Sequence, residues 1–482
     1  MHLLSLLKDL NIFYTEEAEL ADIYISGIAD DSRQVGQGYL FVACKGYEKD
    51  GHEFIEEAIE RGAVAIVAES FVNLGVPCIV VKDTKMLLGS LVSQFYGNPS
   101  KEKIIIGITG TNGKTTTCYM IKFVLEAHGY RCGLIGTIEY VINGESHPSK
   151  NTTPGAVQLQ KLLHESRDDV IVIEVSSHAL KQGRVNGVDF DLCLFTNLDG
   201  EHLDYHDNMD DYFETKYMLF EKMKEAGQVI VNVDDEWGRK LYERLLRKGI
   251  PTLSIGKGRL NDLKLVSDGD YFNLKNGVTL KIDLALPGLH NKYNAAFTVL
   301  VAFLMNLEWE KTLHALKNLK RIPGRFELFQ LHGDVTVVVD YAHTAKGFYY
   351  CLNAIRECGA KRIFHVFGFR GNRDKKKREA MINNSVSISD YYILTFDDLN
   401  NVSDEEMEEE LIYFYETFGK GKGEVITDRT LAIQKAISLA SAGDWVVITG
   451  KGPEMYTKEF NLKTKTDIET VEKLSSSRAK LL

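Results

Sequence analysis

The cysteines of this 482-residue chain lack any pattern. The seven residues are scattered at positions 44, 78, 118, 132, 193, 351 and 358, without a C-x-x-C pair. A disulfide framework needs paired cysteines, whereas an odd, unpatterned set is typical of reduced thiols. The sequence also has no H-E-x-x-H segment, which disfavours a zinc site. We therefore expect a cytoplasmic protein.

Long apolar runs are missing as well. None approaches the roughly 20 residues that span a bilayer, and Met1–Asp9 has too short an apolar stretch for a signal peptide. Excess positive charge is also absent, since the formal net charge is −11. Such a charge disfavours nonspecific binding to nucleic acids and anionic membranes. These absences predict a soluble protein that neither inserts into membranes nor binds nucleic acid.

What is present is the composition of a large globular protein. Hydrophobic residues make up 44% of the chain and charged residues 26%, which allows substantial cores. Short apolar runs recur between helix-length segments. Their continuous apolarity indicates strands buried on both faces, hence largely parallel sheets covered by helices and an α/β fold. The runs are 65–67, 104–106, 170–173, 229–231, 335–339, 363–367 and 445–448.

Two segments divide the chain into about three domains, as its length predicts. Asn98–Lys103 is polar and precedes an apolar run, and Arg321–Arg325 breaks a helical stretch before new strands begin. We predict domains at residues 1–100, 101–322 and 323–482.

Two strongly charged segments are predicted to be solvated. Ser403–Glu410 contains the capping-box pattern of Ser403 and Glu406, so it predicts the start of an exposed helix. Lys375–Arg378 is interpreted as a solvated basic patch, with contact to a phosphate or a carboxylate as the alternative.

A glycine-rich segment, Gly107–Thr117, lies between an apolar run and the helical segment Cys118–Ala127. Strand, glycine-rich turn and helix are the context of a phosphate-binding P-loop, in which backbone N–H groups surround phosphate oxygens. Lys114 would reach the β- and γ-phosphates, and the Thr115 hydroxyl would bind Mg²⁺. Ile108 stands at the usual first glycine position, so a plain glycine-rich turn is the alternative.

Polar clusters follow two further predicted strands. Glu174–Leu180 follows one and Thr196–His206 follows the other. Ligands of open parallel sheets bind at the carboxyl ends of strands, so these clusters are candidates for a site. Glu174 could serve Mg²⁺, and His202 could ligate a second cation, although hard cations prefer oxygen. Judged alone, any one of these histidines is more typical of a hydrogen-bonded structural residue than of a ligand.

Taken together, the motifs resemble those of the Mur ligases, and most of all the UDP-N-acetylmuramoyl-tripeptide synthetase branch. The resemblance covers essentially the whole chain. It implies a small N-terminal α/β UDP-binding domain, a central P-loop ATPase-type parallel sheet and a C-terminal Rossmann-like domain that binds the amino acid. The motifs are Asp31–Val35, Gly38–Ala43, Gly107–Thr116, Asn151–Pro154, Glu174–His178, Asn197–Asp204, Lys216, Gly288–Asn294, Pro323–Glu327 and Asp340–His343.

The resemblance implies an ATP-dependent, ADP-forming amide ligase of peptidoglycan precursor synthesis. ATP would phosphorylate the D-glutamyl γ-carboxylate of UDP-N-acetylmuramoyl-L-alanyl-D-glutamate, and the amine of a diamino acid would attack the acyl phosphate. Lys114 and two Mg²⁺ ions would neutralise the anions that meet. A monomer is expected.

The same resemblance assigns ligands to the two Mg²⁺ ions. Thr115 would hold one, and Glu174 and His202 match the ligands of the second. Lys216 matches a lysine that family members carbamylate, which turns a cation into an oxygen-donating anion. Without the resemblance, Lys216 would be interpreted as a solvated helix lysine.

Substrate-binding residues are also implied by the resemblance. Tyr341 and His343 are interpreted as packing at a strand end. The ATP residues are Gly110, Thr111, Asn112, Gly113, Lys114, Thr115, Thr116, Asn291, Arg325 and Asp340, with His290 beside the adenine. The UDP-sugar residues are Ser32, Asn151, Thr152, Thr153, Ser176, Gln182 and Arg184. The amino-acid residues are Arg373, Asp397, Asp398, Asn400, Gly450 and Glu454.

The third domain departs from the family pattern at the amino-acid site. Enzymes that use meso-diaminopimelate carry Asp-Asn-Pro-Arg where this chain has Asp397–Asn400. Asn400 cannot provide a charged bidentate clamp for a distal carboxylate. The sequence therefore predicts a substrate with a distal ammonium only, such as L-lysine or L-ornithine, facing Asp397, Asp398 and Glu454. Lanthionine stays open. Glu379 and Pro453 also replace the usual proline and histidine.

Three other functions compete with this prediction. A folylpolyglutamate synthetase-like ligase would lack the UDP-binding module that Asp31–Val35 indicates. A divergent paralogue would act on another cell-wall precursor, and a nucleotide-gated switch would bind ATP without turnover.

Overall fold

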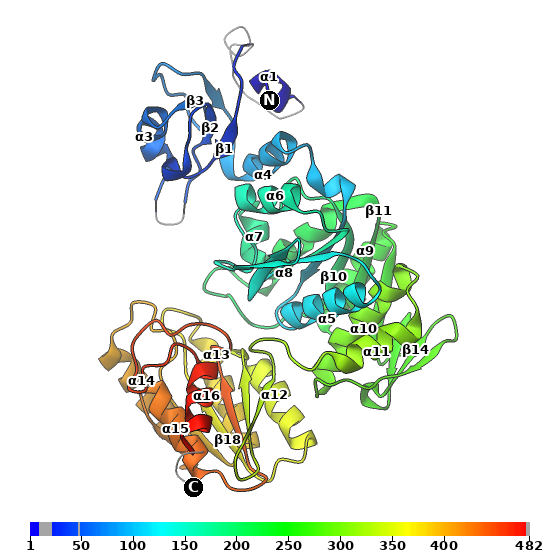
Figure 1. Cartoon of the computed structure of the whole chain (residues 1–482), viewed down its shortest axis with the longest axis vertical. Helices are drawn as coiled ribbons and strands as arrows, with labels where there is room; N and C mark the ends of the chain where they lie inside the picture. Colours follow the sequence, from blue (N-terminus) through cyan, green and yellow to red (C-terminus); the bar gives the residue numbers. More distant parts are fainter. Residues whose placement is uncertain (9–21, 47–48, 479–482) are drawn as a thin grey trace.

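The structure is a computed structural model that describes residues 1–8, 22–46 and 49–478. Within these residues the strands form three sheets of four, eleven and six strands. The sheets use successive parts of the chain and follow one another along the long axis of the molecule (Figure 1). The predicted domain boundaries, at 100/101 and 322/323, fall between the strands of different sheets.

The N-terminal sheet is parallel throughout, in the order β1-β2-β3-β4. Its elements are α1 (Leu3–Leu7), β1 (Gly27–Ala29), the 3₁₀ helices η1 (Ser32–Gln34) and η2 (Gly51–Phe54), β2 (Tyr39–Val42), α3 (Ile55–Glu60), β3 (Ala63–Ala68), β4 (Cys78–Val80), α4 (Thr84–Phe95) and η3 (Pro99–Glu102). Apolar side chains pack on both faces of this sheet, with α1 and α4 on one face and α3 on the other.

The central sheet has the strand order β15-β14-β13-β12-β11-β10-β5-β9-β6-β7-β8. Its strands are β5 (Ile104–Thr109), β6 (Cys132–Ile135), β7 (Glu139–Ile142), β8 (Glu145–Pro148), β9 (Val170–Glu174), β10 (Phe190–Phe195), β11 (Met223–Asn232), β12 (Thr252–Gly256), β13 (Leu263–Val266), β14 (Tyr271–Leu274) and β15 (Thr279–Lys281). The middle strands are parallel, and antiparallel pairs complete both edges.

Helices cover both faces of the central sheet. They are α5 (Lys114–Ala127), α6 (Ala156–Glu165), α7 (Ser177–Lys181), α8 (Met209–Tyr217), α9 (Glu236–Arg247), α10 (Leu289–Leu304), α11 (Trp309–Asn318) and the 3₁₀ helices η4 (Met218–Glu221) and η5 (Ser267–Gly269). Ile106 packs with α5, α10 and α11, whereas its neighbour Ile105 packs with α6 to α9. Burial of adjacent residues on opposite faces explains the continuous apolarity of β5.

The C-terminal sheet has the order β16-β17-β21-β18-β19-β20, parallel except for the β16–β17 pair. Its elements are β16 (Glu327–Leu331), β17 (Val335–Asp340), α12 (Ala345–Glu357), β18 (Ile363–Phe367), α13 (Lys376–Ile388), β19 (Tyr391–Leu394), α14 (Asp404–Phe418), β20 (Gly423–Val425), α15 (Arg429–Leu439), β21 (Trp445–Thr449) and α16 (Asp467–Arg478). Apolar side chains of α12, α13 and α14 pack on one face, and those of α15 and α16 on the other.

The predicted α/β fold is confirmed, and each of the seven predicted apolar runs lies in a strand. The predicted helix after Ser403 is α14, where the Ser403 Oγ accepts a hydrogen bond from the Glu406 N–H. The prediction of an exposed basic patch is wrong for Arg378. Its side chain is 2% exposed and pairs with Glu410 of α14, because α13 and α14 pack against each other. Among the helices of the described residues, none combines enough length and apolarity to span a membrane.

Candidate active site

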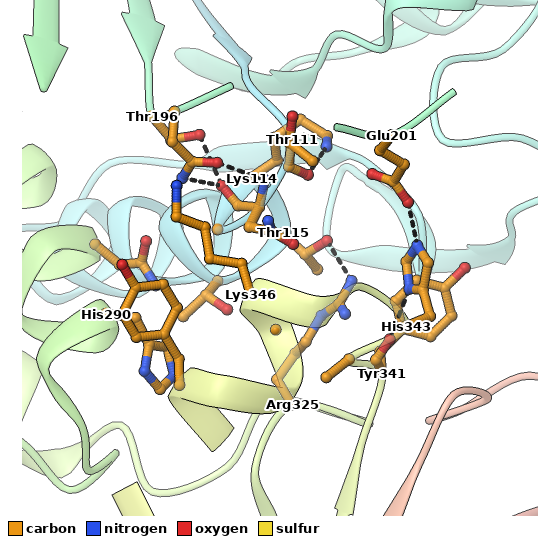
Figure 2. Close-up of a pocket in the computed structure, with 18 of the residues that line it drawn as sticks. Thr111, Lys114, Thr115, Thr196, Glu201, His290, Arg325, Tyr341, His343 and Lys346 are labelled. Atoms are coloured by element: carbon orange, nitrogen blue, oxygen red, sulfur yellow. Dashed lines mark hydrogen bonds and ion pairs between the residues drawn. The ribbon is translucent and has the colours of Figure 1, made fainter. Parts of the chain in front are cut away.

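A cavity of about 560 Å³ lies between the central and C-terminal sheets. Its walls come from the loop after β5, the start of α10 and the loops after β17 and β18. Figure 2 shows Lys114 and Thr115 at the start of α5, with Arg325 approaching Thr115 and Glu201 meeting His343. The cavity thus joins the predicted phosphate site to the predicted amino-acid domain.

The loop between β5 and α5 has the conformation that its glycines permit. Gly110 and Gly113 have φ angles of +144° and +86°. A Cβ at Gly110 would lie 2.0 Å from the Thr196 Oγ1, so no larger residue fits there. Lys114 donates hydrogen bonds of 2.9 Å to the carbonyls of Gly110 and Thr111, which hold its ammonium beside the loop. Burial lowers the pKa of Lys114, against the attraction of Glu174 and Glu201.

Thr115 connects three parts of the chain. Its Oγ1 donates to the Glu174 Oε2 at 3.0 Å and accepts from the Arg325 Nη2 at 2.8 Å. The buried Glu174 carboxylate also accepts hydrogen bonds from the backbone N–H and the hydroxyl of Thr137, at 2.9 and 3.0 Å. Arg325 lies in residues 319–326, which link the central sheet to β16 and are called the hinge below. This network therefore connects the P-loop helix to the hinge.

Lys216 is almost completely buried, with 2% or less of its surface exposed. Its Nζ donates to the Gly110 carbonyl at 2.9 Å and lies 4.6 Å from the centre of the Tyr212 ring. No carboxylate of the described residues pairs with it, and burial followed by repulsion from Lys114 places the pKa of Lys216 well below its ordinary range. The interpretation of Lys216 as a solvated helix lysine, which the sequence suggests when the family resemblance is set aside, is therefore wrong.

His202 lies beside Lys216 in a strained backbone conformation, with φ of +59°. Burial lowers the pKa of His202 to about 3, so its imidazole is neutral and able to ligate a cation. Its ring meets that of His178 edge to face at 5.0 Å. No cluster of three or more His, Cys, Asp or Glu side chains in the described part of the chain has the arrangement of a metal centre.

Glu201 is a site residue that the sequence prediction missed. Its Oε1 lies 2.7 Å from the His343 Nε2 and 3.8 Å from the Lys377 Nζ, both from the C-terminal part of the chain. Burial opposes its charge, yet the facing His343 holds the pKa of Glu201 well below its ordinary range. His343 therefore does more than pack at a strand end. The position of His343 just after strand β17 could have indicated this role in the site, because the carboxyl ends of parallel strands meet at one edge of a sheet.

Models of Mur ligase domains match three parts of the chain. They are the Mur ligase family catalytic domain at residues 24–96, the Mur ligase middle domain at 108–302 and the Mur ligase glutamate ligase domain at 324–452. A protein of Syntrophomonas wolfei is 39% identical over 469 residues, which cover 95% of both chains. The chain belongs to the Mur ligase family. It is an ATP-dependent ligase.

The relative from Syntrophomonas wolfei is named UDP-N-acetylmuramoyl-L-alanyl-D-glutamate--2,6-diaminopimelate ligase, as is one from Bacillus velezensis that is 38% identical over 456 residues, 91% of both chains. A solved structure of an enzyme with that name has a TM-score of 0.68 at 26% identity and covers 97% of this chain and 98% of its own. The MurF ligase of Thermotoga maritima in complex with ADP, 20% identical, shares the fold with a TM-score of 0.67, over 95% of this chain and 99% of its own.

The predicted nucleotide residues of this Mur ligase line the cavity together. All lie in its wall except Gly110, which is buried within the loop and does not line the cavity. The His290 ring is tilted against Tyr350 at 5.8 Å, and the Asn291 Nδ2 donates to the Pro287 carbonyl at 2.7 Å. Both Asp340 carboxylate oxygens accept backbone N–H groups, so Asp340 shapes the hinge.

The predicted UDP-sugar residues are only partly brought together. Thr152 and Ser176 line the cavity, whereas Ser32 lies in the N-terminal part and donates to Glu57 at 2.8 Å. Arg184 donates to Gln182 and to the Thr153 carbonyl, and it pairs with no carboxylate of the described residues. Asn151 accepts a hydrogen bond from the Tyr140 hydroxyl through its backbone carbonyl.

The predicted amino-acid residues are already paired within the protein. The Asp398 Oδ1 accepts from the Lys451 Nζ at 2.5 Å, and the Glu454 Oε2 accepts from the Arg370 Nη2 at 2.5 Å. Burial disfavours the charged form of Asp397, but neighbouring cations, Arg370 first, hold the pKa of that carboxyl below its usual range.

The other predicted amino-acid residues take different positions. Arg373 lines the cavity and lies 3.4 Å from Asp204 of the central domain. Asn400 donates to the Gly371 carbonyl at 2.9 Å and does not line the cavity. Gly450 has φ of +112°, and a Cβ there would lie 2.4 Å from the Asp397 Oδ2. The three acids that the lysine prediction assigned to the distal ammonium therefore already lie beside cations of the protein.

Proposed function

We propose that this Mur ligase joins a diamino acid to the D-glutamyl γ-carboxylate of UDP-N-acetylmuramoyl-L-alanyl-D-glutamate, in peptidoglycan precursor synthesis. The observation that carries the proposal is one cavity, lined by the P-loop residues Lys114 and Thr115 and by Arg373 of the C-terminal domain. The names of the relatives support the same substrate. We also propose that the protein is a cytoplasmic monomer, as the sequence predicts.

The residues of the chain would act by placing positive charges beside the phosphate that is transferred. Lys114 would turn from the carbonyls of Gly110 and Thr111 to the γ-phosphate, where its charge stabilises phosphoryl transfer to the carboxylate. Arg325, on the opposite wall, would add a second positive charge. The amine would then attack the acyl phosphate, forming the amide and releasing phosphate. Closure of the cavity would exclude water from this intermediate.

The donors present fit Mg²⁺. Thr115 and Glu174 offer a hydroxyl and a carboxylate 3.0 Å apart, which suits a hard cation. Thr115 would hold one ion, and Glu174, His202 and carbamylated Lys216 would hold the other. The neutral amine that burial favours at Lys216 is the form that reacts with carbon dioxide. Bound Mg²⁺ would neutralise the charge between the phosphates and the carboxylate.

Arg184 supports the proposed position of the UDP-sugar. It is the arginine of the predicted set, and among the residues that the structure describes its guanidinium has neutral partners only, Gln182 and the Thr153 carbonyl. A guanidinium without a paired carboxylate is suited to bind an anionic group of the substrate.

For the incoming amine, we propose 2,6-diaminopimelate ahead of the L-lysine or L-ornithine that the sequence predicts. Asp397, Asp398 and Glu454, which the lysine prediction assigned to the distal ammonium, each lie beside a cation of the protein, so their charges are already partly balanced. The names of the relatives also favour 2,6-diaminopimelate.

Phosphate release in reactions that omit one component at a time tests the proposal. Release should require ATP, UDP-N-acetylmuramoyl-L-alanyl-D-glutamate and an amino acid together. Release with a folate substrate or another cell-wall precursor would favour a folylpolyglutamate synthetase-like ligase or a paralogue. Nucleotide binding without any release would indicate a switch. A panel of meso-2,6-diaminopimelate, L-lysine, L-ornithine and lanthionine would then identify the amine.

A further inference from the structure

Arg370 is a cavity-lining arginine that the function proposed above leaves without a role. It lies in the loop between β18 and α13 and lines both the main cavity and a small adjoining one. Its side chain is 19% exposed. The Nη2 donates to the Glu454 Oε2 and, at 3.1 Å, to the Gly450 carbonyl. Within the described residues, neither Nε nor Nη1 donates a hydrogen bond; Nε is buried beside Asp397, so Nη1 is the nitrogen that keeps donor capacity for a ligand.

The surroundings of Arg370 hold charges of both signs. Its Nε lies 3.7 Å from the Asp397 Oδ1, too far for a hydrogen bond. The Glu454 carboxylate accepts from Arg370 on one oxygen and from the Tyr341 hydroxyl, at 2.6 Å, on the other. Arg370 and Glu454 therefore form a pair beside the cavity, and Glu454 is 32% exposed.

Asn400 cannot bind a carboxylate of the substrate in the way that Arg370 can. Its amide is uncharged and donates to the Gly371 carbonyl, and its backbone carbonyl accepts from Asn372. Arg370 instead presents a charged, planar group with unused donors, which matches a carboxylate.

We infer that Arg370 determines the amino-acid specificity of this ligase by binding the distal carboxylate of a diamino dicarboxylic acid. The inference rests on the proposed function. Glu454 would receive the distal ammonium, so one end of the substrate bears both charges that the Arg370–Glu454 pair complements. A substrate with an ammonium alone would draw Glu454 away from Arg370 and leave that guanidinium with the Gly450 carbonyl as its remaining hydrogen-bond acceptor among the described residues, which is unfavourable.

The test compares kcat/KM for meso-2,6-diaminopimelate and L-lysine in the wild type, Arg370→Gln and Arg370→Lys. The wild type should prefer meso-2,6-diaminopimelate. Arg370→Gln should lower kcat/KM for this substrate about 30-fold, mainly through KM, because a hydrogen bond to a charged group is lost. Its kcat/KM for L-lysine should change by less than about threefold. Arg370→Lys keeps the charge and should retain an intermediate preference.

Arg362→Gln is the matched control, since Arg362, just before β18, pairs with Asp444, just before β21, and lines neither cavity. It should leave the substrate ratio unchanged. Equal losses on both substrates, or a wild-type preference for L-lysine, would overturn the inference. If Arg370→Gln does not fold, as judged by thermal unfolding and ADP binding, Arg370→Lys decides. A wild type that releases phosphate without any amino acid would instead contradict the proposed function.

Discussion

At the scale of single residues, Lys216 shows how burial changes chemistry. Its amine sits on the Gly110 carbonyl and the Tyr212 ring, where an unpaired ammonium is unfavourable. The depressed pKa of Lys216 favours the neutral, nucleophilic amine. A lysine placed this way is suited to become a carbamate, whereas an exposed lysine would stay protonated.

Replacing Lys216 by alanine should lower kcat about 100-fold, because a preorganised charged group is lost from the phosphate site. ADP affinity should change little. Steady-state kinetics and mass spectrometry in bicarbonate and in carbon dioxide-depleted buffer would measure both the loss and the modification. Lys224→Ala, which removes a partly buried pair with Asp191 away from the cavity, is the control. Full activity of Lys216→Ala would contradict the assigned role.

Thr115 offers a second test at the residue scale. Thr115→Val removes the hydroxyl that meets Glu174 and Arg325, so we expect kcat to fall about 100-fold and the Mg²⁺ concentration for half-maximal rate to rise. Thr115→Ser keeps the hydroxyl and should stay within a few-fold of the wild type. A Mg²⁺ titration of phosphate release distinguishes the two. Equal rates in both variants would argue against a ligand at this position.

At the scale of elements, α13 and α14 are joined by a buried ion pair. Arg378 is 2% exposed, its Nη2 donates to the Arg370 carbonyl at 2.7 Å, and its Nη1 meets Glu410. The pair thus fixes the loop that carries Arg370 as well as the helix packing. Removing one partner of a buried pair leaves an uncompensated charge, which costs more than the pair itself contributes.

Glu410→Gln should therefore lower the free energy of unfolding by about 3 kcal/mol. Urea unfolding followed by circular dichroism would measure the change. Glu408→Gln, on the exposed side of the same helix, should have an effect below about 0.5 kcal/mol. Equal effects of the two substitutions would show that the Arg378–Glu410 pair contributes no more to the free energy of unfolding than an exposed glutamate does.

At the scale of the whole molecule, three hydrogen bonds between described residues join the central and C-terminal parts across the cavity. They are Glu201 with His343 at 2.7 Å, Arg373 with Asp204 at 3.4 Å, and Arg325 with Thr115 at 2.8 Å. All three surround the proposed reaction centre. They would hold the cavity closed while the acyl phosphate exists.

His343→Ala should lower kcat about tenfold, since a hydrogen bond to a charged group contributes about 2 kcal/mol to the closed state. The radius of gyration with nucleotide and UDP-substrate bound should increase. Small-angle X-ray scattering and kinetics would measure the two effects together. His147→Ala, on the exposed strand β8, is the control and should change neither. A lower kcat with an unchanged radius would contradict a closing role for His343.

The sequence by itself determined the P-loop and the strands and helices around it, because strand, glycine turn and helix are neighbours in the chain and depend on local geometry. The apolar runs likewise predicted the strands of an α/β fold. Only the tertiary structure decided that Arg378 is buried, that His343 meets Glu201 across 142 residues, and that Asp398 and Glu454 are paired with Lys451 and Arg370. The charge of a side chain is visible in the sequence, but its partner is set by how distant segments pack, and the partner decides which substrate the charge can bind.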